Sequence, residues 1–351
     1  MQWDKSNNFI ILFIVLSCMI IFGFLPWMIY ELRHNDKELH VQAWFIAGVF
    51  MCLSIPLTFY DISQHFRHWN QPDLQKYIVR ILLMIPVYSV DSFLALRFVD
   101  IYIYIDAIRE CYEAYVIYNF YMYLLTYLKS DPNFNTILTT RTSRHVFPLC
   151  CLPTWDMEYS FLRQCTIGVT IYILVKPILA LITIICELTD TYKEGHWTYS
   201  GGYTYVAIIN SLCQCYAMYC LVLLYLIFKQ DLSLIKPIPK FLIIKAVVFL
   251  SFWQSVLIAI LIETKVIESN PNWTKYNNSN VAASIQDFII CIEMFLAALV
   301  HNRVFSYKEY KDPDGDQERL NTINALHNLF NISDVKQNVV GVFKNKQYIS
   351  L

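Results

Sequence analysis

Charged side chains inside apolar segments are the residues of this sequence that could do chemistry. Lys176, followed by Pro177, lies at the centre of an apolar run over residues 165–187. A charge near the centre of a spanning helix costs ~2.5 to 3.5 kcal/mol on insertion scales, so Lys176 needs a counter-ion. We expect Glu293, midway along the last apolar run, or Asp91 to supply it. An organic anion could then replace that carboxylate on Lys176. A purely structural buried pair is the alternative.

A second pair of charges, Arg80 and Asp91, lies within another apolar run. They are eleven residues apart, about three helical turns, so they share a helix face but lie roughly 16 Å apart and cannot pair directly. Arg80, near the cytoplasmic end, can extend its side chain to lipid headgroups. Asp91 is deeper, so it must face a partner or water.

A stripe of charged residues follows in the next run. Asp106, Arg109, Glu110 and Glu113 occupy positions i, i+3, i+4 and i+7 of one helix, where Arg109 can pair with its neighbours. Two interpretations stay open for this polar outer stripe: a helix end that faces water, or an acidic wall that coordinates cations on the outer side. The stripe continues less regularly to Asn119. The candidate substrate-binding residues are thus Lys176, Asp91, Glu293 and Asn119.

Apolar helices must hold these charges at membrane depth. The 351-residue sequence is 56% hydrophobic and 16% charged, whereas soluble domains are about 25% charged. Eight apolar runs are long enough to span a bilayer, so we predict an all-α fold, a polytopic membrane helical bundle. The runs are residues 9–30, 42–60, 78–96, 102–128, 165–187, 203–228, 241–263 and 281–301. The fourth is the weakest because the charged stripe lies in its first half.

Loop charges indicate the orientation of this bundle. With the N-terminus inside, the cytoplasmic loops hold more than twice as many Lys and Arg residues as the opposite loops, in accord with the positive-inside rule. The glycosylation sequons at Asn272 and Asn277 can be used only outside or in a lumen, which agrees. We therefore expect a cytoplasmic C-terminus.

Three regions follow from this topology. Residues 1–41 hold the N-terminal hydrophobic segment and a connecting loop, residues 42–301 form a seven-span transmembrane domain, and residues 302–351 form a cytoplasmic tail. The length of the first apolar run favours a retained anchor, and a cleaved signal peptide is the alternative. A cytoplasmic loop over residues 129–164 interrupts the transmembrane domain.

The loop and the tail carry two smaller features. Cys150 and Cys151 are candidate lipidation sites that would rest on the membrane surface, and unmodified thiols are the alternative. The tail has apolar residues at helical spacing, which predict a short amphipathic helix on the membrane or a partner. These residues are Leu320, Ile323, Leu326 and Phe330.

Several function classes lack support in this sequence. We find no basic cluster interleaved with aromatic residues, so we expect no nucleic-acid partner. We also recognise no His/Asp metal cluster, no Gly-rich phosphate loop and no nucleophile beside a base, so we expect no enzyme, cofactor or metal site.

Several strings in order resemble the transmembrane protein 184 family, which is similar in turn to the alpha subunit of the organic solute transporter. They include residues 78–82 (IVRIL), 111–120 (CYEAYVIYNF), 176–177 (KP), 245–254 (KAVVFLSFWQ) and 286–294 (QDFIICIEM). The resemblance covers about residues 42 to 310. It implies seven family-type spans, so the first apolar run is an extra N-terminal span.

The resemblance implies two alternative roles. The solute transporter's alpha subunit moves steroid-like and other organic anions by facilitated diffusion and needs a small single-span partner subunit. The 184 group is associated mainly with vesicle trafficking and signalling. We therefore expect a multi-pass protein of the plasma membrane or of endosomal and vesicle membranes that transports organic solutes, with a single-span subunit or a second copy as partner. A trafficking or signalling adaptor without transport activity is the alternative.

Overall fold

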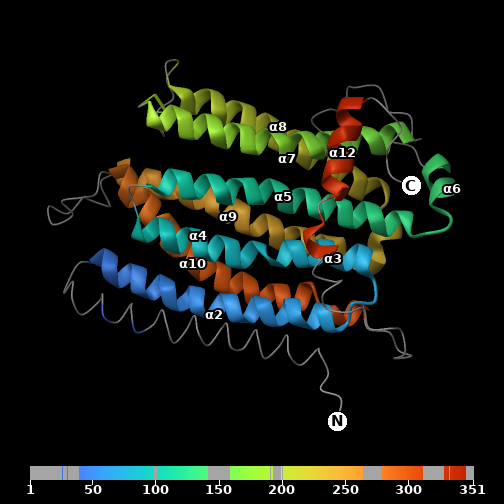
Figure 1. Cartoon of the computed structure of the whole chain (residues 1–351), viewed down its shortest axis with the longest axis horizontal. Helices are drawn as coiled ribbons and strands as arrows, with labels where there is room; N and C mark the ends of the chain where they lie inside the picture. Colours follow the sequence, from blue (N-terminus) through green and yellow to red (C-terminus); the bar gives the residue numbers. More distant parts are fainter. Residues whose placement is uncertain are drawn as a thin grey trace, which may run out of the picture. The chain divides into compact units, whose positions relative to one another are not determined.

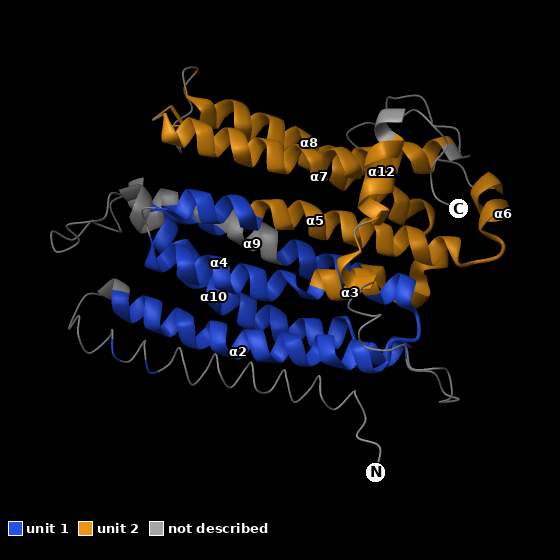
Figure 2. Cartoon of the chain, viewed as in Figure 1, with its two compact units in different colours: residues 1–75, 82–109, 238–325 blue, residues 76–81, 110–237, 326–351 orange. Residues whose placement is uncertain are grey.

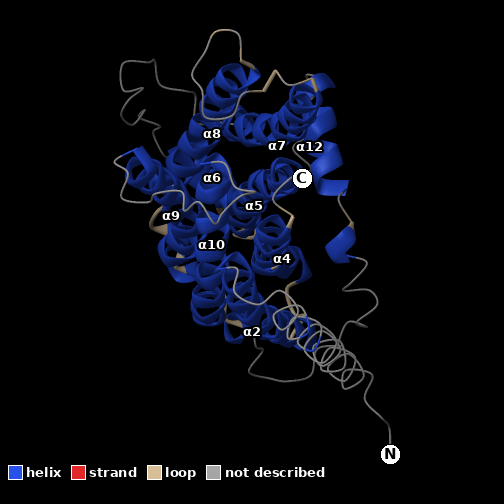
Figure 3. Ribbon diagram, turned by 90° about the vertical axis from the view of Figure 1, so that its left-hand side faces the viewer, coloured by secondary structure: helices blue, strands red, loops and turns tan. Residues whose placement is uncertain are grey.

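The structure is a computed structural model in which every element of the described residues is helical (Figure 3). It describes residues 26, 30, 39–98, 101–140, 159–189, 191–192, 199, 201–263, 278–310, 328–331 and 333–344. The chain divides into two compact units, which Figure 2 colours separately. Unit 1 comprises residues 1–75, 82–109 and 238–325, and unit 2 comprises residues 76–81, 110–237 and 326–351.

Unit 1 is built on three long helices that lie side by side (Figure 1). They are α2 (Leu39–Arg67), α4 (Met84–Arg97) and α10 (Asn278–Val304). Their common core includes Trp44, which stacks on Phe93 with ring centroids 5.1 Å apart, and the buried Cys291. Most of α9 (Pro237–Glu263) also belongs to this unit, as does the short η3 (Tyr307–Tyr310).

Proline explains a break in the predicted run over residues 78–96. The structure divides it into α3 (Pro72–Leu82) and α4, with Leu83 between them. Pro86 lies in the first turn of α4, where its missing N–H costs nothing, but its ring would clash with the carbonyl of Leu82 in a continuous helix.

Unit 2 contains the pair α7 (Tyr159–Leu188) and α8 (Gly202–Ile227), which pack along each other (Figure 1). Most of α5 (Tyr102–Lys129) belongs to this unit, with α6 (Phe134–Thr140), η2 (Asp231–Ile235) and α12 (Ser333–Lys344). Helix α12 contacts α7. The helix pair is tight at Gly168, where an added Cβ would lie 2.7 Å from the Cys220 sulfur.

Five segments of the described residues are long and apolar enough to cross a membrane. They are Val41–Arg67, Pro72–Arg97, Ser160–Leu188, Gly202–Ile227 and Ala283–Tyr310. Helices α5 and α9 cover two more of the predicted runs, while the first run falls outside the described residues. The multi-pass membrane architecture is therefore established at this level, and the count of seven spans plus one stays a prediction.

The helix bounds differ from the predicted regions at two places. Within the predicted loop over residues 129–164, α6 forms and α7 already begins at Tyr159, because Phe161 and Leu162 are buried. Most of the predicted amphipathic tail helix lies outside the described residues. The tail helix that the structure describes is α12, further along the chain. Cys150, Cys151, Asn272 and Asn277 also lie outside the described residues, so their modification stays a prediction.

Candidate functional site

The buried ammonium of Lys176 is the centre of a polar site in unit 2. Lys176 is 3% exposed, and Pro177 follows it inside α7. Because proline has no N–H, the Ile173 carbonyl one turn earlier lacks its helical donor, which is a common cause of a bend. The Nζ of Lys176 lies 3.0 Å from Oε2 of Glu110 on α5, whose side chain is 56% exposed.

The predicted counter-ion of Lys176 was therefore wrong. Glu110 supplies the carboxylate, whereas Asp91 pairs with Arg109 and Glu293 accepts a hydrogen bond from Gln254. Sequence spacing had assigned Glu110 to a stripe along its own helix. The fold instead directs it to a lysine 66 residues away.

A second polar contact lies close to this pair along α5. Glu113, one helical turn after Glu110, accepts a hydrogen bond of 3.0 Å from Nε2 of Gln214 on α8. Gln214 was missed by the sequence prediction, although an amide side chain within an apolar run was a usable signal. Helix α5 thus forms two polar contacts, one through Glu110 with Lys176 of α7 and one through Glu113 with Gln214 of α8.

The other half of the predicted stripe belongs to a charge cluster in unit 1. Arg109 lies 2.9 Å from Asp106, 3.1 Å from Asp287 and 3.4 Å from Asp91, and it donates a hydrogen bond of 3.1 Å to Ser92. Asp91 thus has the partner that its depth requires. Asp287 of α10 is only 3% exposed.

This cluster holds one guanidinium against three carboxylates from α4, α5 and α10. The guanidinium of arginine has several N–H donors and can bind more than one carboxylate. A buried carboxylate is costly unless a cation of this kind pairs with it. Among the described residues, no group of His, Cys, Asp and Glu side chains has the geometry to hold a metal ion. The cluster therefore joins three helices through ion pairs of one arginine.

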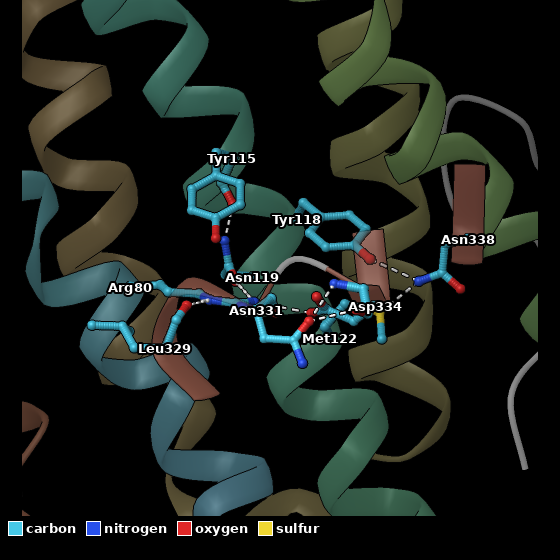
Figure 4. A network of polar contacts seen from close by, with 10 residues as sticks. Arg80, Tyr115, Tyr118, Asn119, Met122, Leu329, Asn331, Asp334 and Asn338 are labelled. Carbon is cyan, nitrogen blue, oxygen red and sulfur yellow. Dashed lines mark hydrogen bonds and ion pairs between the residues drawn. The ribbon is translucent and has the colours of Figure 1, made fainter. Parts of the chain in front are cut away.

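Arg80 does not extend to lipid headgroups as predicted. It is 2% exposed, because its guanidinium contacts Asp334 at 2.9 Å and two tail carbonyls (Figure 4). It also donates a hydrogen bond of 3.2 Å to Asn119, whose amide nitrogen donates to the Tyr115 carbonyl at 2.6 Å. The polar contacts of Asn119 thus serve Arg80. Sequence spacing cannot reveal a partner that lies 254 residues along the chain.

Comparison with known proteins identifies the same family as the sequence strings. Residues 43–310 match the family model described as organic solute transporter Ostalpha. Protein LAZ1 homolog 1 of Arabidopsis thaliana is 35% identical over 283 residues, which are 76% of this chain and 57% of the relative. The chain thus spans little more than half the length of that curated relative. No solved structure matches the chain.

The matched residues include the strings that carried the resemblance and the whole of α7 and α5, the helices that hold Lys176 and Arg109. The expected resemblance to the transmembrane protein 184 group and the solute transporter's alpha subunit is confirmed. This multi-pass membrane protein belongs to the organic solute transporter Ostalpha family.

Proposed function

We propose that this protein carries organic anions across its membrane by facilitated diffusion, and that Lys176 binds the anionic group. The observation that carries the proposal is the unequal burial of the Lys176–Glu110 pair. The lysine side chain is 4% exposed, whereas the glutamate side chain is 56% exposed. The description of the matched family as an organic solute transporter supports the same role.

Unequal burial makes the pair suited to exchange. A buried ammonium without a counter-ion is costly, so Lys176 must be paired at every stage. Glu110 can turn outward, because more than half of its side chain is already exposed. A carboxylate or sulfate that takes its place preserves the charge balance, and its departure restores the original pair. An exchange of this kind lets an anion bind and leave without a large barrier.

The neighbouring residues favour a substrate with one anionic group. Glu113 is held by Gln214 and stays near the site, so a second negative charge on the substrate would be repelled. The α7 side chains nearest Lys176 on the same face are mostly apolar, with Val169 fully buried and Leu179 6% exposed, and Tyr172 and Thr183 add hydroxyl groups. A steroid sulfate, which carries one anionic group on an apolar body, has this chemistry.

The test is uptake of a labelled steroid sulfate and a panel of organic anions in cells that express the wild type, Lys176→Ala or Lys176→Arg. Surface abundance is measured in parallel, and Lys229→Ala, at an exposed lysine after α8, is the matched control. We expect saturable uptake that Lys176→Ala abolishes at equal abundance and that Lys176→Arg retains in part. Loss of folding in Lys176→Ala would support a purely structural pair instead.

If the wild type reaches the cell surface but shows no uptake, the assay is repeated with a small single-span subunit. Uptake that appears only with a small single-span subunit would make that subunit part of the transporter. Continued absence with such a subunit would favour the trafficking or signalling adaptor. The assay also reports the hosting membrane, plasma membrane or endosomal and vesicle membranes.

A further inference from the structure

The C-terminal segment of the chain packs against other helices of unit 2. Its described part consists of residues 328–331 and α12. Its polar groups converge on Arg80 of α3 (Figure 4). The Nε of Arg80 donates to the Leu329 carbonyl at 3.1 Å, and Nη2 donates to the Asn331 carbonyl at 2.8 Å. The Nη1 group contacts the Asp334 carboxylate at 2.9 Å.

The receptor side of this contact is built around the guanidinium. The rings of Tyr77 and Tyr115 lie with their centroids 5.6 and 5.9 Å from Cζ of Arg80, within the range of cation–π attraction. Tyr112 donates a hydrogen bond of 2.7 Å to the Arg80 carbonyl, and Asn119 accepts from Nη1. These contacts belong to α3 and α5, so the guanidinium is oriented by residues other than those of the tail.

A second contact fixes the register of α12. Asn338, one turn after Asp334, donates hydrogen bonds to the Tyr118 hydroxyl at 2.7 Å and to the Met122 sulfur at 3.5 Å. The opposite face of α12 is solvated, since Ser333, Lys336 and Gln337 are exposed. The segment therefore docks through polar groups as well as the buried Leu329, and water can satisfy those polar groups when the segment leaves.

We propose that Arg80 is the centre of an anion-binding site that Asp334 occupies in this structure, and that a phosphate or sulfate group displaces the C-terminal segment from it. A buried guanidinium without a counter-ion is strongly destabilising, so the Asp334 carboxylate holds the docked segment in place, and an anion that takes over Arg80 favours its release. The planar fork of arginine binds phosphate as readily as carboxylate, with two parallel hydrogen bonds. Binding of the anion and docking of the tail are thus mutually exclusive.

The group has two sources, a lipid headgroup or a free anion, and the arms of the test separate them. Hydrogen exchange of residues 333–344 is measured on the full-length protein in phosphatidylcholine nanodiscs. One arm adds inorganic phosphate or sulfate, and the other adds phosphatidic acid or a phosphoinositide to the lipid. Because hydrogen bonds to charged groups contribute about 1.5–3 kcal/mol, displacement should speed exchange by roughly tenfold to a hundredfold. Unchanged exchange in both arms would overturn the proposal.

Three variants assign the effect to Arg80. Asp334→Asn should speed exchange of α12 without any added anion, and it should bind radiolabelled phosphate or the anionic lipid more tightly than the wild type. Arg80→Gln should also release α12 but no longer respond to anions. Lys336→Gln, on the exposed face of α12, should behave like the wild type. If Arg80→Gln does not fold, the tighter binding by Asp334→Asn decides, and equal or weaker binding overturns the proposal. The test is independent of transport.

Discussion

The two members of the Lys176–Glu110 pair should contribute very unequally to stability. Glu110→Gln keeps the shape of the side chain but leaves the Lys176 ammonium, 4% exposed, without a counter-charge. From the insertion cost of a buried charge we expect a loss of about 2.5–3.5 kcal/mol in the free energy of unfolding. Lys176→Met leaves a glutamate whose side chain is 56% exposed, and such pairs contribute under about 1 kcal/mol from the exposed side.

The double variant completes this argument. When both charges are removed, no buried ion is left, so Lys176→Met in the Glu110→Gln background should restore most of the lost stability. The assay is unfolding of the purified protein in mixed micelles with rising denaturing detergent, with Lys229→Met as the control for loss of an exposed lysine. Equal losses in the two single variants, or a double variant that is no better than Glu110→Gln, would refute the exchangeable pair and with it the mechanism proposed for anion binding.

The remaining predictions concern packing and charge elsewhere in the two units. Arg109→Ala removes the cation from three carboxylates and should cost about 3–5 kcal/mol, measured as loss of folded protein against Arg303→Ala, at an exposed position. Gly168→Ala places a methyl group 2.7 Å from the Cys220 sulfur and 2.8 Å from a Tyr216 ring carbon, so it should destabilise the α7–α8 contact by about 1–3 kcal/mol. A lower midpoint of thermal unfolding checks the second prediction, and a midpoint equal to that of the wild type would contradict it.

Local patterns predicted the helices well because a helix in a bilayer depends on local residues. Its backbone groups are satisfied within the segment, so an apolar run of sufficient length largely determines it. The break before α4 was not predicted, although Pro86 within the run over residues 78–96 was a usable signal. The start of α7 at Tyr159 could not be predicted from local patterns, because it depends on the burial of Phe161 and Leu162 against other helices.

Charge partners were harder to predict because they depend on tertiary structure. The sequence shows that Lys176 and Asp91 each need a partner, since burial of an ion has a large cost. It does not show which of many carboxylates the fold brings near, and the prediction of Glu293 or Asp91 as the counter-ion of Lys176 was wrong. The prediction that Arg80 extends to lipid headgroups was wrong for a related reason. Its position near a helix end suggested contact with lipid headgroups, but its partner is Asp334, which lies 254 residues further along the chain.

The number of carboxylates around each cation is our reason for proposing Lys176, rather than Arg109, as the cation that exchanges its partner. Arg109 faces three carboxylates, of which Asp91 and Asp287 are almost fully buried, so release of any one leaves the others in place and opens no position for an anion. Lys176 forms its ion pair with one carboxylate, that of Glu110, which is the more exposed member of the pair. A substrate anion that replaces Glu110 meets an unshared ammonium. The same substrate at Arg109 would join an excess of negative charge, which is why the proposed binding site is Lys176 rather than the larger cluster.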